Sequence, residues 1–201
     1  MASVALICNL ALSHIGIEKE IANLTTEKSP EASTCRRYYD STRDEVLRDF
    51  RWPFATKILA LGLLEEDPNS KWAFSYRYPT DCLLAREILS GVMPNTRQSR
   101  VPYQIGQDDS GKLIFTNQAN AELEYTVMCN DPQIYPPDFV MAFSLRLASY
   151  IAPRLTGGDP FKMAERSFQL FNLSKTKAQA NASNEEQPQE DPQSEFERAR
   201  E

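Results

Sequence analysis

The chain has 201 residues, of which 41% are hydrophobic, so it is long enough and apolar enough to bury a core. Its net charge of -6 argues against a dedicated nucleic-acid binder, because such a protein needs a basic surface to neutralise phosphates. The N-terminus lacks the charged lead of a signal peptide, and the longest apolar stretch, 139–152, is shorter than the roughly 20 residues that cross a bilayer. We therefore expect a protein made in the cytosol without a membrane anchor.

Two helices are predicted in the first 53 residues. Apolar residues recur at helical spacing over 4–15, and Ser3 is a candidate N-cap. Residues 29–31, Ser-Pro-Glu, supply an N-cap, a proline at the first helical position and an acid near the positive end of the helix dipole. Pro53 ends the second helix, because it disfavours the α conformation at the residue before it.

Residues 54–135 are predicted to form a β-rich lobe. Aromatic residues alternate with small or polar ones, so a strand places four of them on one face: Trp72, Phe74, Tyr76 and Tyr78. We interpret this face as the core side of a sheet, in preference to a platform for stacking bases, which needs interleaved basic residues. Further strands are predicted over 101–105, 112–115 and 121–128.

The C-terminal part is predicted to add two more helices and a tail. Pro136-Pro137-Asp138 opens a helix that has almost no polar face, which is typical of the central helix of a bundle. Asp159-Pro160 opens the last helix. Residues 181–201 are too polar to offset the entropy of ordering them, so we expect an extended tail.

The predicted fold is therefore α+β. The helical pairs 1–53 and 136–180 form a bundle of four helices, 54–135 is an inserted β-rich lobe, and 181–201 is a docking tail.

Few residues suggest catalysis. His14 stands alone near a helix end without a nucleophile motif, so we interpret it as a boundary histidine. The carboxylate pairs Glu65-Glu66 and Asp108-Asp109 have the residue types of a glycosidase, although adjacent acids in loops are usually solvated. The cysteines are far apart, with no C-x-x-C pair, and are expected to be reduced core residues: Cys8, Cys35, Cys82 and Cys129. We expect no cofactor and no metal.

Three ordered motifs carry a resemblance to a known family. They are Ala11-Leu12-Ser13-His14-Ile15-Gly16, then Ala32-x-x-Cys35-x-x-x-Tyr39-Asp40-x-x-Arg43-Asp44 leading into Trp52-Pro53-Phe54-Ala55, and then Trp72-Ala73-Phe74-Ser75-Tyr76-x-Tyr78-Pro79-x-Asp81-Cys82-Leu83. In this order and spacing they resemble the head-to-tail adaptor family of short-tailed bacteriophages, also called tail tubular protein A. The resemblance covers roughly 3–182. It departs from the family where Ile15-Gly16 replaces Leu-Gly and where Tyr78-Pro79 replaces Leu-Pro.

The resemblance implies a structural virion protein and not an enzyme. Such adaptors form a homo-oligomeric ring of about twelve copies, a closed assembly with heterologous contacts, between the portal and the tail nozzle at the head-tail junction. The ring is assembled in the host cytoplasm, and DNA passes through its channel during ejection without specific binding. No membrane is involved.

The resemblance also suggests two groups of site residues. A fold or subunit-packing signature consists of Trp52, Pro53, Phe54, Trp72, Tyr76 and Pro79. The predicted portal-binding residues of the tail are Pro188, Pro192, Phe196, Arg198 and Arg200.

Two alternatives stay open. One is a phage-associated cell-wall hydrolase that uses a carboxylate pair to cleave peptidoglycan. The other is a bacterial scaffold or adaptor of a different complex.

Overall fold

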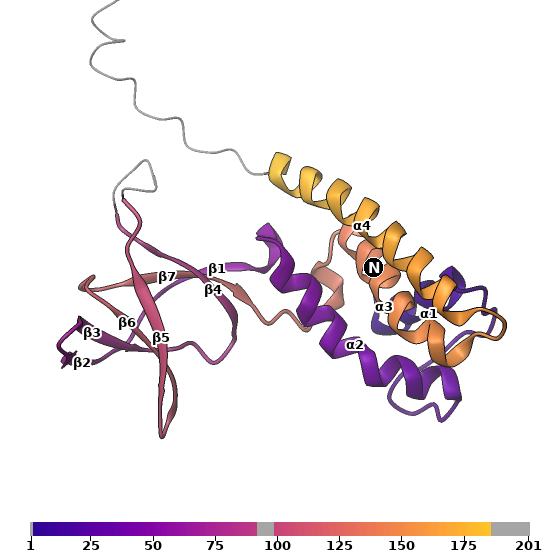
Figure 1. Cartoon of the computed structure of the whole chain (residues 1–201), viewed down its shortest axis with the longest axis horizontal. Coiled ribbons are helices and arrows are strands. Elements are labelled where there is room, and N and C mark those ends of the chain that lie inside the picture. Colours follow the sequence, from indigo (N-terminus) through magenta and orange to yellow (C-terminus); the bar gives the residue numbers. More distant parts are fainter. Residues whose placement is uncertain (1, 92–98, 186–201) are drawn as a thin grey trace, which may run out of the picture. The chain divides into compact units, whose positions relative to one another are not determined.

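The computed structural model describes residues 2–91 and 99–185, and within them the chain is α+β, as the sequence predicts. It divides into two compact units. Residues 2–55 and 128–185 form the helical unit, and Thr56–Val127 form the β unit (Figure 1).

The helical unit is built from α1 (Val4–His14), α2 (Pro30–Asp49), α3 (Pro137–Leu155) and α4 (Pro160–Glu185). Two short 3-10 turns precede the β unit and α3, namely η1 (Pro53–Ala55) and η2 (Pro132–Ile134). The predicted helix starts are confirmed at α1 and α2. The Ser3 side chain accepts a hydrogen bond from the backbone N–H of Leu6 at 3.1 Å, and the Ser29 side chain accepts one from Ala32 at 3.2 Å.

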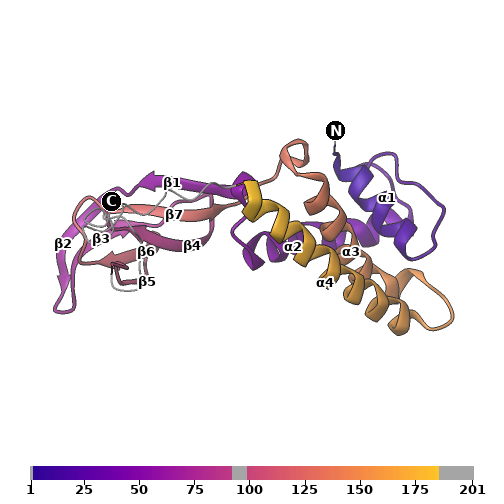
Figure 2. The ribbon, with the colours of Figure 1, turned by 90° about the horizontal axis from the view of Figure 1, so that it is seen from above.

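Helix α3 is the centre of this unit. It packs against α1, α2 and α4, whereas α1 and α2 contact each other only slightly (Figures 1 and 2). Its buried side chains come from every side of the helix, and they include Phe139, Phe143, Leu147 and Ile151. A helix that is apolar all round requires neighbours on all sides, which explains why the other helices surround it.

An aromatic cluster joins α3 to the end of α2. Phe139, which is fully buried, lies with its ring centroid 5.1 Å from Trp52, 4.9 Å from Phe54 and 5.0 Å from Tyr135. The Trp52 indole N–H donates to the backbone carbonyl of Val46 at 2.9 Å, so the burial of this ring leaves no polar atom unpaired.

The β unit contains two antiparallel sheets. One has the strand order β1-β7-β4, from β1 (Thr56–Ala60), β7 (Glu122–Val127) and β4 (Cys82–Leu89). The other has the order β2-β3-β6-β5, from β2 (Leu63–Asn69), β3 (Trp72–Arg77), β6 (Gly111–Thr116) and β5 (Tyr103–Asp108). The chain reverses between β5 and β6 at Asp109-Ser110, between the two strands predicted over 101–105 and 112–115 (Figure 1).

The aromatic face predicted for β3 lies mostly in the core of this unit. Tyr76 and Tyr78 are buried there with Ile114 and Tyr125, and Phe74 is partly buried against them. Trp72 is also buried but lies outside this cluster, and its indole N–H donates to Gln104 at 3.2 Å. The interpretation as a core face is therefore confirmed for three of the four rings.

The last helix is longer than the sequence suggests. It continues to Glu185, five residues into the segment 181–201 that was assigned to the extended tail. Ala178 is buried, and the amide of Asn181 donates to the carboxylate of Asp138 on α3. These contacts with α3 hold a segment whose own sequence has little apolar content.

We expect replacement of Phe139 by alanine to lower the free energy of unfolding of the helical unit by about 3–5 kcal/mol, because it leaves a cavity among aromatic rings. The matched control is Phe161→Ala on α4, where the side chain is 74% exposed. Urea titrations followed by the helical circular dichroism signal measure both changes. Equal losses in the two variants would contradict the central position of α3.

In the β unit, we expect Asp81→Asn to cost at most about 1 kcal/mol of stability at neutral pH, since its charge pair is partly exposed. The Asp81 carboxylate accepts hydrogen bonds from Lys57 Nζ and from the Tyr125 hydroxyl, each at 2.9 Å, and the Lys57 contact is the main reason that the Asp81 pKa is lowered. The stability that the Asp81 carboxylate contributes is complete above the pKa that Asp81 has in the unfolded chain. It disappears as the pH falls through the lowered pKa of Asp81 in the folded state.

The difference in stability between the Asp81→Asn variant and the unchanged chain should therefore disappear at acid pH. Thermal melts over a pH series measure it, with Asp109→Asn, at an exposed turn position, as the control. A difference that persists in acid would show that the charge pair is not its origin.

Candidate functional site

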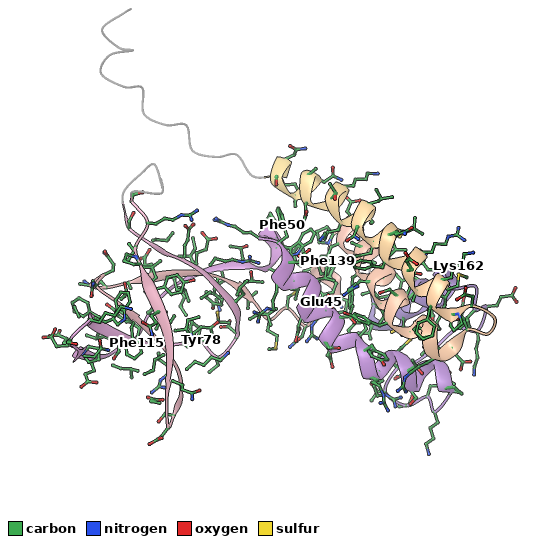
Figure 3. The ribbon with its side chains drawn as sticks, in the orientation of Figure 1. Glu45, Phe50, Tyr78, Phe115, Phe139 and Lys162 are labelled. Carbon is green, nitrogen blue, oxygen red and sulfur yellow. The ribbon has the colours of Figure 1, made fainter. Side chains whose placement is uncertain are left out.

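A groove of the helical unit is lined by residues of α2 and α4 together with Arg146 of α3. It encloses about 730 Å³. Its lining residues are Ser41, Asp44, Glu45, Val46, Arg48, Asp49, Arg146, Phe168, Phe171, Asn172 and Lys175. We refer to it as the Arg146 groove; Glu45, on its α2 wall, is labelled in Figure 3.

Arg146 makes the principal polar contacts of this groove. Its Nη2 lies 2.6 Å from Glu45 Oε1, and its Nε donates to the same oxygen at 3.1 Å. The Tyr150 hydroxyl donates to Glu45 Oε2 at 2.8 Å and accepts from Arg146 Nη2 at 2.6 Å. The carboxylate of Glu45 on α2 thus accepts hydrogen bonds from two side chains of α3.

Aromatic rings surround the same guanidinium group. Its central carbon lies 4.4 Å from the ring centroid of Tyr150, 4.7 Å from that of Phe168 and 5.5 Å from that of Phe171. A guanidinium group is weakly hydrated and stacks well on aromatic faces, so this position suits arginine better than lysine. The ion pair and the rings together connect α2, α3 and α4.

A second bridge crosses the groove from α2 to α4. Lys175 Nζ lies 2.8 Å from Asp49 Oδ2 and 5.3 Å from the Phe171 ring. The carboxylates of Glu45 and Asp49 therefore both face cations. Burial raises the Tyr150 pKa, and the hydrogen bond to the Glu45 carboxylate raises it further. Such paired charges between helices stabilise their relative positions.

The carboxylates that suggested a hydrolase lie elsewhere. Glu65 and Glu66 follow each other on the edge strand β2, so their side chains point to opposite faces of the sheet. Asp108 is paired with Arg77 at 3.0 Å, and this contact lowers the Asp108 pKa. A general acid needs the opposite shift.

The single histidine lies where α1 meets α3. His14 Nε2 is 3.2 Å from the hydroxyl oxygen of Ser144, and burial lowers the His14 pKa. Its surroundings are those of a packed boundary residue.

The four cysteines are free thiols, of which Cys8, Cys35 and Cys129 are buried and Cys82 is half-buried. The hydrogen bond that the Cys8 thiol donates to Cys35, followed by burial, raises the Cys8 pKa. Within the described ranges, no group of three His, Cys, Asp or Glu residues is arranged to hold a metal ion.

The signature residues lie in both units. Trp52 and Phe54 belong to the aromatic cluster of the helical unit, and Pro53 begins η1 between them. Tyr76 donates its hydroxyl hydrogen to the backbone carbonyl of Gln118 at 2.9 Å, and the carbonyl of Pro79 accepts from the N–H of Cys82 at 3.1 Å. Within each unit these residues support turns and cores.

The predicted portal-binding residues lie outside the described part of the chain: Pro188, Pro192, Phe196, Arg198 and Arg200. The Arg146 groove was not predicted as a site. A lone arginine within the apolar run 139–152 was its only signal in the sequence, because the partners come from α2 and α4, which are distant in the chain.

A scan against protein-family models finds no match for this chain, and a search of the curated proteins finds none either. Among the described helices, none combines the length and the apolar character that a membrane span requires.

We expect Arg146→Lys to lower the stability of the helical unit by about 1–2 kcal/mol, because lysine keeps the charge but loses the forked contact and the ring stacking. In a double-mutant cycle with Glu45→Gln, the coupling energy should be about 1 kcal/mol. Arg154→Lys, at an exposed position of α3, is the control. Additive effects of the two substitutions would contradict the network.

Proposed function

We propose that this chain is a structural subunit of a phage ring that joins the portal to the tail nozzle and continues the DNA channel. The ordered motifs described above, which run from Ala11 to Leu83, support this proposal, because their order and spacing resemble one family of adaptors. The proposal includes a virion location at the head-tail junction, assembly in the host cytoplasm and the absence of an enzymatic role.

The observation that carries the proposal is the structural role of the motif residues. Trp52 and Phe54 pack on Phe139, while Tyr76 closes the core of the β unit. A resemblance confined to a catalytic site would place such residues around reactive groups. Here the motif residues pack in the cores of two units, which favours a structural protein.

In this proposal the helices act as a four-helix bundle interrupted by the β unit. The bridges Glu45–Arg146 and Asp49–Lys175 hold α2, α3 and α4 at defined separations. A ring that transmits DNA benefits from subunits that do not deform. A ring of about twelve identical copies needs a heterologous contact that closes on itself.

The tail provides the proposed portal contact. Residues 186–201 contain six acidic residues, two arginines and one aromatic residue, Phe196. A segment of this composition gains most of its order from a partner, so its binding is coupled to assembly.

Electron microscopy of the purified chain mixed with portal rings tests this function. We expect a ring of about twelve subunits seated on the portal. A chain truncated after Glu185 should keep its melting temperature, because α4 is complete, and should lose portal binding. Phe196→Ala should weaken binding and Ser194→Ala should not. A chain that stays monomeric and does not bind the portal would overturn the proposal.

A further inference from the structure

The outer side of α4 carries a stripe of basic and apolar residues. Lys162, Arg166, Leu170, Leu173 and Lys177 are separated by three or four positions, so they share one face of the helix. All five are exposed, with Leu170 at 42% and Leu173 at 71%. We refer to these residues as the α4 stripe.

The stripe lies opposite the side of α4 that packs on α3. The residues of that inner side include Ser167, Phe171 and Ala178, which are buried. None of the three cations of the stripe forms an ion pair with another residue of the described ranges. Lys162 lies near the N-terminal end of the helix (Figure 3).

This combination fits an acidic segment that has an apolar anchor. Exposed cations around two leucines attract carboxylates by charge and an aromatic side chain by burial of apolar surface. The chain itself supplies such a segment directly after α4. Residues 186–201 carry a net charge of -4, from six acids and two arginines, and Phe196 is their one aromatic residue.

The length of this segment allows it to reach the whole stripe. Lys162 precedes Glu185 by 23 helical residues, a distance of about 35 Å at 1.5 Å per residue. Sixteen residues of extended chain span about 53 Å. Because the segment is covalently attached, its effective concentration at the stripe is of millimolar order, so weak contacts suffice.

We propose that residues 186–201 dock on the α4 stripe of their own chain while no other partner holds them. The carboxylates face Lys162, Arg166 and Lys177, and Phe196 covers the leucines. Any partner that takes the tail must then compete with this surface. The docking proposal does not rest on the proposed function in a phage ring, so either of these two proposals can fail without the other.

Zero-length carbodiimide crosslinking of the full-length chain tests the docking, with Lys162 as the reporter. An equal mixture of unlabelled and nitrogen-15 chains separates the two origins of a crosslink. Crosslinks within one chain all carry a single isotope, whereas half of the crosslinks between copies are mixed. We expect single-isotope crosslinks from Lys162 to Glu190, Glu195 or Glu197, with a yield that falls as salt is added.

A variant pair shows whether the stripe is responsible. Arg166→Glu with Leu173→Ser keeps the reporter Lys162 and should reduce the crosslink yield about fivefold. The matched control, Arg154→Glu with Phe161→Ser, changes an exposed arginine and an equally exposed apolar residue off the stripe and should leave the yield unchanged. Circular dichroism melts verify that both variants fold.

Three results would overturn the proposal. Mixed-isotope crosslinks would make a second copy the occupant. An equal reduction of the crosslink yield in the stripe variant and in the control would show that the stripe is not responsible. The absence of crosslinks from Lys162 to the tail at low salt would show that the segment does not lie on α4.

Discussion

The packing of α3 is the constraint on which the helical unit depends. Helices α1 and α2 each pack more extensively on α3 than on each other, and α4 lies along α3. Each large apolar side chain that is fully buried on α3 contributes about 1.5–3 kcal/mol through the burial of apolar surface. The ring of Phe139 is central, because it contacts aromatic residues from the end of α2 and from the segment before α3.

The charges of the helical unit follow from this burial. Arg146 belongs to α3 and is only 16% exposed in its side chain, so its guanidinium group requires partners to offset the loss of water. Glu45, Tyr150 and two phenylalanine rings provide them. Arg43 on α2 has the same requirement and meets it with Asp40 and Asp44. The partners of Arg43 lie on its own helix, whereas the pair between Arg146 and Glu45 joins two helices and so helps to specify how α2 and α3 pack.

The β unit depends on a different balance. Its core is closed by tyrosines, whose rings are apolar and whose hydroxyl groups still find partners: Tyr76 bonds to Gln118 and Tyr125 to Asp81. Its outer strands β1 and β2 expose apolar side chains along open sheet edges. On β2, Pro68 and the left-handed backbone of Asp67, with φ of 48°, interrupt the regular ladder that another strand needs for pairing.

The sequence by itself determined the helix starts at Ser3 and Ser29, the α+β class and most of the inward face of β3. These features depend on local hydrogen bonds and on the period of apolar residues, and neighbours in the chain supply both. Strands β1, β2 and β4 escaped individual prediction because each lies at the edge of its sheet and lacks alternating burial.

Only the tertiary structure decided where the charges and the end of α4 lie. Arg146 and Glu45 are 101 positions apart, so no local pattern relates them. Helix α4 extends to Glu185 because α3 offers contacts to Ala178 and Asn181, and the polar sequence there has no such preference of its own. Long-range packing, which no window of sequence contains, is the physical reason for both.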